Sequence, residues 1–390
     1  MSIKDIGSKC CGCRACLQCC PCNAIRFQPD KYGFEYPTLN AELCVNCNLC
    51  ETVCPMMNED VKNSEVFACG AAFATDQQTK YTGSSGGLFG VFAQAVLSEG
   101  GIVFGAAFDK NLKLKTTSAE TEEELIPLYK SKYLLCDTNQ QFRAIEQELQ
   151  KERFVLYCSS PCQIAALKRY LKKDYSHLLT IDFICHGVGS QTLFDESIAY
   201  TEKREEIQIQ AVTLRYKKAK ASSHYYQYGY LKNGKLRQRS DLYFSFPYYY
   251  AYCKQLACRD SCYDCKYASC ERVGDITVGD FHTIERYMPK IDRFAGVSML
   301  LINTQKGKKW FDTVASKLEY YPMEKDVLYA NNRFSRGSVV PAEQMAFRES
   351  IATEPFEMTV KRFLKPSREW KKLIYYKSPR ILRKIIMKLR

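Results

Sequence analysis

The sequence predicts a protein of three parts: a small α+β module at the N-terminus, an α/β domain built on a mixed sheet, and a basic, helical C-terminal tail. Two cysteine runs of the same spacing lie within the first 58 residues, and short apolar strands alternate with helices in the middle of the chain. Twelve of the 56 Lys and Arg residues fall in the last 30 positions. We expect boundaries at 1–58, 66–200, 201–335 and 336–390, where the middle two ranges are the halves of the α/β region.

The N-terminal module is defined by two cysteine runs that repeat the order C-x2-C-x2-C-x3-C-P. The runs begin at Cys10 and Cys44, 34 residues apart. This spacing is typical of bacterial two-cluster ferredoxins, in which three cysteines of a run wrap one 4Fe–4S cluster and the fourth ligates the other cluster. The predicted ligands of the first cluster are Cys10, Cys13, Cys16 and Cys54, and those of the second are Cys20, Cys44, Cys47 and Cys50.

Zinc and disulfides explain the two cysteine runs less well than iron–sulfur clusters do. Zinc would be satisfied by two C-x2-C pairs and gives no reason for a third cysteine in phase or for Pro21 and Pro55. Disulfides need an oxidising compartment, and the N-terminal residues show no apolar signal segment. Three cysteines lie outside the pattern and are expected to pack beside the ligands: Cys11, Cys19 and Cys22.

Composition and charge favour a cytoplasmic redox protein over a nucleic-acid-binding one. Twenty-one cysteines in a chain without a visible export signal indicate metal and redox chemistry in a reducing compartment. The longest apolar stretches are too short to span a bilayer. The formal net charge is +13, but residues 361–390 carry +11 of it, so the basic character belongs to the tail and not to a nucleic-acid-binding face.

The region between residues 66 and 335 alternates strands and helices along the chain. The expected strands are an apolar segment from Val66 and residues 100–108, 153–158, 178–185, 272–281 and 296–304; the expected helices are 88–98, 139–151, 163–171 and 307–318. Tyr-rich, β-like segments occupy residues 207–250, where packing around a sheet is the default explanation. The alternation predicts a parallel or mixed sheet with covering helices.

Two cysteines follow predicted strands of this sheet. Cys162 comes shortly after strand 153–158, and Cys185 closes strand 178–185 and is followed by His186. Open α/β sheets build their sites beyond the carboxyl ends of their strands. Each cysteine alone is more often a small core residue, but their matched positions predict a shared site.

A third cysteine group lies further along the chain, in CKQLACRDSCYDCKYASC (253–270). Cys262 and Cys265 form its tightest pair and are the best local candidates for two ligands of one metal. A self-contained zinc site is the local alternative, with Cys258, Cys262, Cys265 and Cys270 as its ligands. The strand that follows this group ends on Asp280.

A run of small residues, GSSGG (83–87), precedes the predicted helix 88–98. Gly86 and Gly87 would let the backbone approach a ligand closely at the helix N-terminus, where free N–H groups favour an anion. A tight strand-to-helix turn explains the same residues without a ligand. The run alone is therefore a weak indication of a phosphate site.

As an ordered set, these motifs resemble the beta subunits of deazaflavin (coenzyme F-420) hydrogenases and dehydrogenases, a family with bacterial and plant flavoprotein relatives. The segments that carry the resemblance are GSSGGL (83–88), KSKYLLC (130–136), SSPCQIAALKRYL (159–171), DFICHGVGS (182–190) and SCYDCKYASCERVGDITVGDF (261–281). With the ferredoxin module ahead of them, the resemblance covers roughly residues 1–320.

The resemblance implies that the α/β region is a flavin-binding domain, with FAD near the GSSGG turn and the KSKY segment. The cofactor-binding residues that it implies are Gly83, Ser84, Ser85, Gly86, Gly87, Lys132 and Tyr133. It also implies a third 4Fe–4S cluster beside the flavin, whose ligands carry over to Cys162, Cys185, Cys262 and Cys265. The sequence departs from the family pattern at Ser159-Ser160, Cys136 and His282. These departures concern the identity of the electron donor or substrate more than the binding of flavin.

The function that the resemblance implies is that of an iron–sulfur flavoprotein oxidoreductase. It would pass electrons between a ferredoxin-like partner or a reduced coenzyme, 4Fe–4S clusters and FAD, and family association points to a small organic substrate of a polysaccharide pathway. His186 and His282 are the candidates for catalytic proton transfer; a hydrogen-bonding role beside the cluster is the alternative for either. The rival interpretation is a non-catalytic electron-transfer or redox-sensing subunit of a larger complex.

The C-terminal tail ends in PRILRKIIMKLR (379–390), whose apolar residues fall on one helical face with basic residues around it. Such a helix could lie on an anionic membrane surface, which would place the protein at the inner face of the membrane. A tail that packs on its own domain or on a partner is the alternative.

Overall fold

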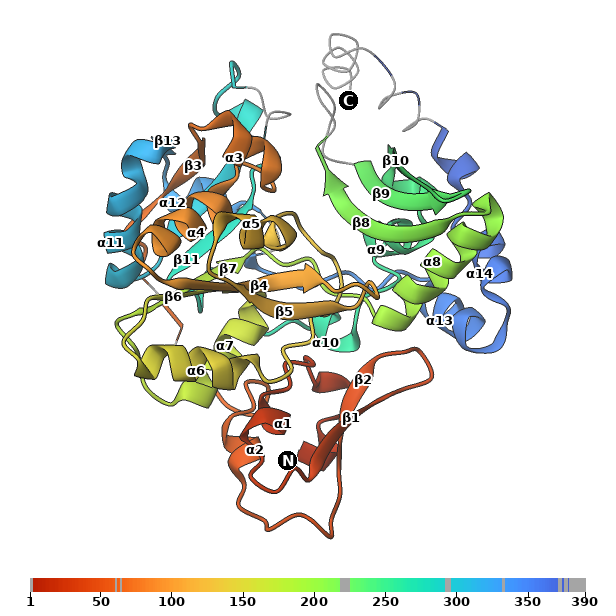
Figure 1. The fold of residues 1–390 in the computed structure, drawn as a ribbon, viewed down its shortest axis with the longest axis horizontal. Helices are drawn as coiled ribbons and strands as arrows, with labels where there is room; N and C mark the ends of the chain where they lie inside the picture. The colour runs from red at the N-terminus through yellow and green to blue at the C-terminus, as the bar shows by residue number, and fades with distance from the viewer. Residues whose placement is uncertain are drawn as a thin grey trace.

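The computed structural model describes residues 3–59, 62–63, 65–217, 225–291, 296–331, 334–370, 374 and 378. These residues form an N-terminal module, a large mixed sheet with covering helices, and a small antiparallel sheet with its own helices (Figure 1). The N-terminal module, red in Figure 1, lies beneath the large sheet, next to helices α6, α7 and α10.

Two short strands and two short helices build the N-terminal module. Strands β1 (Ile25–Pro29) and β2 (Glu35–Leu39) form an antiparallel pair, and the helices are α1 (Ala15–Cys19) and α2 (Leu49–Thr52). Each helix begins after a residue in the left-handed region, Arg14 at φ 59° and Asn48 at φ 57°. The chain therefore turns sharply within each cysteine run, directly before the helix of that run begins.

The large sheet has eight strands among the described residues, in the order β13-β3-β12-β11-β7-β6-β4-β5. Their bounds are β3 (Ala68–Ala74), β4 (Ile102–Phe108), β5 (Leu114–Ala119), β6 (Val155–Ser159), β7 (Leu178–Phe183), β11 (Ile276–Asp280), β12 (Ser298–Ile302) and β13 (Leu318–Pro322). The central strands β4, β6, β7 and β11 run parallel, and the outer strands pair antiparallel. The predicted mixed sheet is confirmed.

Helices cover both faces of the large sheet. Helices α4 (Leu88–Ser98) and α11 (Gln305–Val314) share a buried cluster with Leu156, whereas α6 (Gln141–Gln150) and α7 (Pro161–Leu171) share another with Tyr157. Successive residues of a strand point to opposite faces, so these two clusters lie on opposite sides of β6. Shorter helices connect the strands: α3 (Gln77–Thr82), α5 (Glu122–Leu125), α10 (Asp260–Tyr263) and α12 (Lys325–Tyr329).

The Tyr-rich region forms the small sheet, ordered β10-β9-β8. Its strands are β8 (Gln208–Tyr216), β9 (Tyr225–Lys232) and β10 (Lys235–Leu242), and its helices are α8 (Gln191–Glu205), α9 (Pro247–Cys253), α13 (Gln344–Thr353) and α14 (Phe356–Phe363). Buried rings such as Tyr226, stacked on Phe246 with centroids 5.3 Å apart, form one core between this sheet and its helices. The tyrosines therefore serve chiefly as core residues.

The ranges 66–200 and 201–335, predicted as halves of one α/β region, share the large sheet, whereas residue 336 does not mark the end of the folded part. The large sheet draws five described strands from before residue 200 and three from after it. Past residue 336, α13 and α14 bury Phe347 and Phe363 in the Tyr-rich core, so the folded part continues to about residue 364. The amphipathic segment 379–390 lies outside the described residues. Within the described part of the chain, no helix combines the length and apolar character that crossing a membrane requires.

Polar contacts fix the N-terminal module against the large sheet. The buried Gln18 side chain donates to Thr138 Oγ1 (3.1 Å) and accepts from the Phe142 backbone N–H (2.9 Å). Arg143 donates to the Gln18 carbonyl oxygen from two nitrogens, at 2.7 and 3.0 Å. On another side of the module, Lys266 Nζ donates to the Pro55 carbonyl at 2.8 Å. The cysteine runs thus have a defined position relative to the ends of β6 and β7.

Candidate functional site

The first predicted ligand set surrounds a small cavity inside the N-terminal module. The cavity measures about 10 Å³, and apolar side chains such as Ile3 and Ile6 complete its wall. The cysteines that line it include the whole predicted set: Cys10, Cys13, Cys16 and Cys54. All four are buried. Arg14 also lines the cavity, and the rest of its wall is apolar or thiol. Four thiols converging in such a shell are the donor set that a 4Fe–4S cluster takes, so these residues fit the group.

The second predicted ligand set lies nearer the surface. Cys47 is exposed, and Cys20, Cys44 and Cys50 are half-buried. Exposed apolar residues, Leu43 and Val45, lie on either side of Cys44. Cys19 also belongs to this neighbourhood, because burial and then the nearby thiols of Cys50 and Cys20 raise its pKa to about 12.

The third predicted ligand set is assembled from distant parts of the chain. Cys162 lies in the first turn of α7, and Cys185 follows β7, the parallel neighbour of β6. Burial, followed by the thiols of Cys162 and Cys265, raises the pKa of Cys185. Burial and the thiols of Cys258 and Cys185 likewise raise the pKa of Cys262. The structure therefore gathers the four predicted cysteines and adds Cys258 as a fifth neighbour.

A glycine permits this gathering. Gly187 has φ 95°, a conformation that side chains disfavour. A Cβ at this position would lie 2.8 Å from Cys258 Sγ and 3.3 Å from Cys262 Cβ. The Cys-His-Gly segment can thus lie directly against the segment that contains Cys258 and Cys262.

Cys270 does not join this group. Its Sγ lies 3.9 Å from the Phe334 carbonyl oxygen, and its side chain packs in the buried cluster that contains Cys69. The local zinc alternative therefore lacks its fourth thiol near the other three. Across the described ranges, no three His, Cys, Asp or Glu side chains are grouped so that they could hold a single metal ion.

A cavity of about 400 Å³ lies at the carboxyl ends of β6, β7 and β11, next to the third cysteine set. This volume falls in the range of about 300–1,000 Å³ that is usual for ligand and cofactor pockets. The polar and charged residues that line it include Ser84, Ser85, Lys130, Lys132, Tyr133, Cys185, His186, Arg215, Asp280 and His282. Both candidate histidines and Cys185 therefore face one space.

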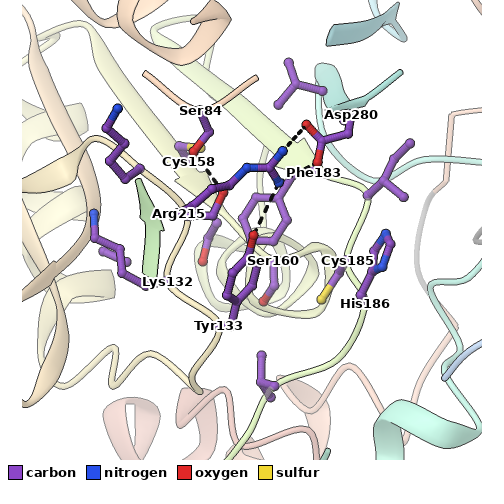
Figure 2. A pocket seen from close by; sticks show the side chains of 18 of the residues that line it. Ser84, Lys132, Tyr133, Cys158, Ser160, Phe183, Cys185, His186, Arg215 and Asp280 are labelled. Atoms are coloured by element: carbon purple, nitrogen blue, oxygen red, sulfur yellow. Dashed lines mark hydrogen bonds and ion pairs between the residues drawn. The ribbon is translucent and has the colours of Figure 1, made fainter. Parts of the chain in front are cut away.

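An ion pair crosses this cavity (Figure 2). Arg215 Nη2 donates to Asp280 Oδ1 at 2.7 Å, Nη1 donates to the other carboxylate oxygen, and Nη1 also lies 3.3 Å from the Tyr133 hydroxyl. Burial opposes ionisation of Asp280, but the charge of Arg215 lowers its pKa below the ordinary value. His282 Nε2 is 3.7 Å from Asp280 Oδ2. The Tyr133 ring is held by stacking on Tyr252, with centroids 4.5 Å apart.

Two lysines at the cavity wall are easily deprotonated. Burial and then the charge of Arg215 lower the pKa of Lys130 to about 8, and burial lowers the pKa of Lys132 to about 7. Their ammonium groups are held by backbone carbonyls: Lys130 Nζ donates to Tyr81 O and Lys132 Nζ to Tyr129 O, each at 2.6 Å. An anion in the cavity would favour the charged form of both lysines.

The GSSGG turn contributes its serines to the cavity, while its glycines serve the packing of the turn. Ser84 and Ser85 line the cavity. A Cβ on Gly86 would lie 2.5 Å from Ala72 O, on Gly87 2.8 Å from Lys80 Cα, and on Gly83 2.7 Å from Gly87 Cα. The Gly86 N–H already donates to Ser298 Oγ at 2.9 Å. A tight turn accounts for the glycines, but this turn joins α3 to α4 and not a strand to a helix as the sequence suggested.

Sequence reasoning missed Arg215, the residue at the centre of the cavity. It is the next-to-last residue of AVTLRY (211–216), a segment that was interpreted as sheet packing because of the tyrosines in the region. The available signal was a basic residue within a β-like segment. Nothing in the sequence links it to Asp280, 65 positions away.

Thiol groups gathered beside a cofactor-sized cavity on a mixed sheet define a redox protein of the iron–sulfur class. Comparison with protein families agrees: residues 9–58 match the family model for the 4Fe-4S dicluster domain, and residues 152–326 match that for the C terminus of the coenzyme F420 hydrogenase/dehydrogenase beta subunit. Residues 152–326 are thus similar to the C-terminal region of coenzyme F420 hydrogenase/dehydrogenase beta subunits, and a 4Fe-4S dicluster domain lies ahead of them. The iron–sulfur assignment from the cysteine spacing is thereby confirmed.

Individual relatives cover limited parts of the chain. The ferredoxin-type protein NapF of Haemophilus influenzae is 40% identical over 57 residues, which make up 14% of this chain and 32% of that protein. The ferredoxin-like protein in the nif region of Rhizobium leguminosarum bv. trifolii is 33% identical over 64 residues, 15% of this chain and 92% of that protein. The chain thus spans about a third of the Haemophilus protein.

A solved structure is also similar to this chain. It is a chain of the F420-reducing NiFe hydrogenase complex from Methanosarcina barkeri, with a TM-score of 0.43 and 16% sequence identity. The similarity covers 78% of this chain and 94% of that one.

Proposed function

We propose that this protein is an iron–sulfur flavoprotein oxidoreductase in which FAD occupies the 400 Å³ cavity and a third 4Fe–4S cluster lies beside it. Cys162, Cys185, Cys262 and Cys265 would hold that cluster. The observation that supports both parts is the position of Cys185, which lines the cavity and also lies among the gathered thiols. A cofactor in the cavity would therefore be next to the cluster.

The cavity wall fits a flavin nucleotide in its donor chemistry. Ser84, Ser85 and the two lysines, Lys130 and Lys132, would bind the phosphates and ribityl chain, and the stacked Tyr133 offers an aromatic surface. A bound flavin exchanges a hydride or two electrons with one partner and single electrons with another, which is chemistry of the cofactor and not of the chain. Arg215 and Asp280 would set the charge of the cavity around it.

The three thiol sets form a series from the surface to the cavity. The second set is exposed at Cys47, the first is buried, and Cys11 lies between the first and third sets, with the thiols of Cys13 and Cys162 as hydrogen-bonding neighbours. This series supports electron transfer between an external partner and the cavity. The partner that we propose is a ferredoxin-like protein or a reduced coenzyme, and the substrate is a small organic molecule.

Proton transfer falls to His186 or His282. Both line the cavity, and His282 has 58% of its side chain exposed, which would let it exchange protons with solvent. His186 adjoins Cys185, so a hydrogen bond to the cluster environment is its alternative role.

FAD is expected to bind more weakly at pH 9 than at pH 6. Lys130 and Lys132 lose their protons as the pH rises through about 8 and about 7, while Asp280 stays ionised because its pKa is lowered by Arg215. FAD that binds to the protonated lysines raises their pKa, so the affinity for FAD is greatest below pH 7 and decreases above pH 8. The affinity falls about tenfold for each lysine whose pKa rises by one unit on binding. Fluorescence titration of flavin-stripped protein measures this.

Riboflavin, which lacks phosphate, is the matched ligand and should bind with little pH dependence. Lys132→Met should flatten the FAD profile, whereas Lys151→Met, at an exposed site, should not. Equal pH dependence for FAD and riboflavin would contradict the assignment of the lysines. Failure of the wild-type protein to bind FAD at any pH would favour the rival, a non-catalytic electron-transfer or redox-sensing subunit.

A further inference from the structure

Arg259 is a fully buried arginine at the junction of the N-terminal module and the large sheet. It directly precedes α10 and has no exposed surface. Its Nε donates to the Cys10 carbonyl at 2.6 Å, and its Nη2 donates to the Glu35 carbonyl at 2.9 Å. The Tyr36 ring covers the guanidinium, with Cζ 4.1 Å from the ring centroid. Three contacts therefore hold the guanidinium rigidly against the first cysteine run.

The remaining nitrogen of this guanidinium is unused. Arg259 Nη1 is buried and has no hydrogen-bond partner among the described residues. No described carboxylate forms an ion pair with Arg259 either, although buried charges in proteins are nearly always paired. A buried N–H without a partner calls for an explanation, and a group bound beside it is one.

The surroundings of Arg259 indicate which group that is. A Cβ on Gly12 would lie 3.5 Å from Arg259 Cζ, so the loop of the first cysteine run passes directly over the guanidinium. The thiols whose negative charge would act on Arg259 are those of Cys10, Cys11 and Cys262. Cys11 and Cys13 also share a buried cluster with Cys162 and Cys265. Arg259 thus lies where the first and third thiol sets meet.

We propose that Arg259 is a positioning residue for electron transfer. Its guanidinium supplies a positive charge and an N–H donor to the sulfurs of the cluster on the first cysteine set. The reduction potential of that cluster is therefore raised above that of the cluster on the second set. An added electron makes a cluster more negative, so a fixed positive charge and hydrogen bonds to its sulfurs favour the reduced state. Electrons entering at the exposed second set would then be drawn inward. The direction of transfer toward the third set rests on the proposed function; the effect on the first cluster rests on the dicluster domain alone.

The test is an anaerobic redox titration followed by EPR on the full chain, comparing wild type, Arg259→Gln and Arg143→Gln. Arg143 is the control because its guanidinium also docks the N-terminal module through a backbone carbonyl, that of Gln18. Arg259→Gln is expected to lower the potential of one N-terminal cluster so that its reduced-to-oxidised ratio at the wild-type midpoint falls about tenfold, which is about 59 mV for one electron. The other cluster and both clusters of Arg143→Gln should keep their potentials.

An unchanged potential in an iron-replete Arg259→Gln protein, or an equal shift of both clusters, would overturn the proposal. If Arg259→Gln does not retain iron, Arg259→Lys is tested in its place. Lysine keeps the positive charge but lacks the several N–H donors of the guanidinium, so we expect a smaller shift of the same cluster to lower potential. An unchanged potential in Arg259→Lys would overturn the proposal. The readout uses only the two N-terminal clusters. Absence of FAD or of the third cluster would end the proposed function without affecting this result.

Discussion

Replacing Cys162 with serine is expected to lower the iron content of the anaerobically purified protein from about twelve to about eight atoms per chain, at four irons per cubane cluster. Cys162 lies in the first turn of α7, just beyond the carboxyl end of β6, and its thiol lies near those of Cys185 and Cys265. Removing one of four ligands in a buried site leaves the cluster without a complete donor set. Colorimetric iron analysis and the absorption near 400 nm measure the loss.

Cys270→Ser is the matched control. Cys270 belongs to the same stretch of sequence as Cys262 and Cys265 but packs toward Phe334 and away from the other thiols. It should therefore retain about twelve irons. Full iron in Cys162→Ser, or loss of iron in Cys270→Ser, would contradict the third ligand set and return attention to the local set that includes Cys270.

Asp182→Asn is expected to lower the free energy of unfolding by about 3–5 kcal/mol, because it leaves the buried charge of Arg272 unpaired. The side chains of Asp182 and Arg272 are 0% and 3% exposed, and Asp182 Oδ1 lies 3.1 Å from Arg272 Nη2. The other carboxylate oxygen accepts from the Gly274 N–H at 3.0 Å. Arg272 in turn donates to the carbonyls of Tyr267 and Ser269, so this pair ties β7 to the chain that follows Cys265.

The decrease is measured as a shift of the urea midpoint under anaerobic conditions, at unchanged slope. Because the same pair positions the Cys265 segment beside Cys185, part of the third cluster's iron should be lost with it. Asp312→Asn removes an exposed helical ion pair with Lys308 and should change stability by less than about 0.5 kcal/mol. Equal effects of the two substitutions would contradict the structural role assigned to Asp182.

Local patterns in the sequence predicted the elements of the fold well. The strand–helix alternation gave β4, β6, β7, α4 and α7 within a few residues, because each element has its own apolar run and a clear terminus. The cysteine spacing predicted the dicluster domain, since its ligands are local and the loop geometry demands that order. The end of the folded part was less predictable, because α13 and α14 lie beyond residue 336 and pack into the Tyr-rich core.

Long-range pairs in the site could not be derived from the sequence. Arg215 meets Asp280 only because β8 ends beside β11, and Arg259 meets Cys10 only because the N-terminal module docks under α10. Neither arginine belongs to a spacing pattern. The third cysteine set was inferred from the family resemblance and stays a prediction, which the nearness of these thiols to one another supports.

Iron, zinc and flavin counts on anaerobically purified protein, with its absorption spectrum, test the proposed function most directly. Three clusters and one flavin predict about twelve irons, no zinc and one FAD per chain. About eight irons with zinc would favour a structural zinc at the third cysteine group. About eight irons without flavin would leave only the dicluster domain and would contradict the proposed flavoenzyme.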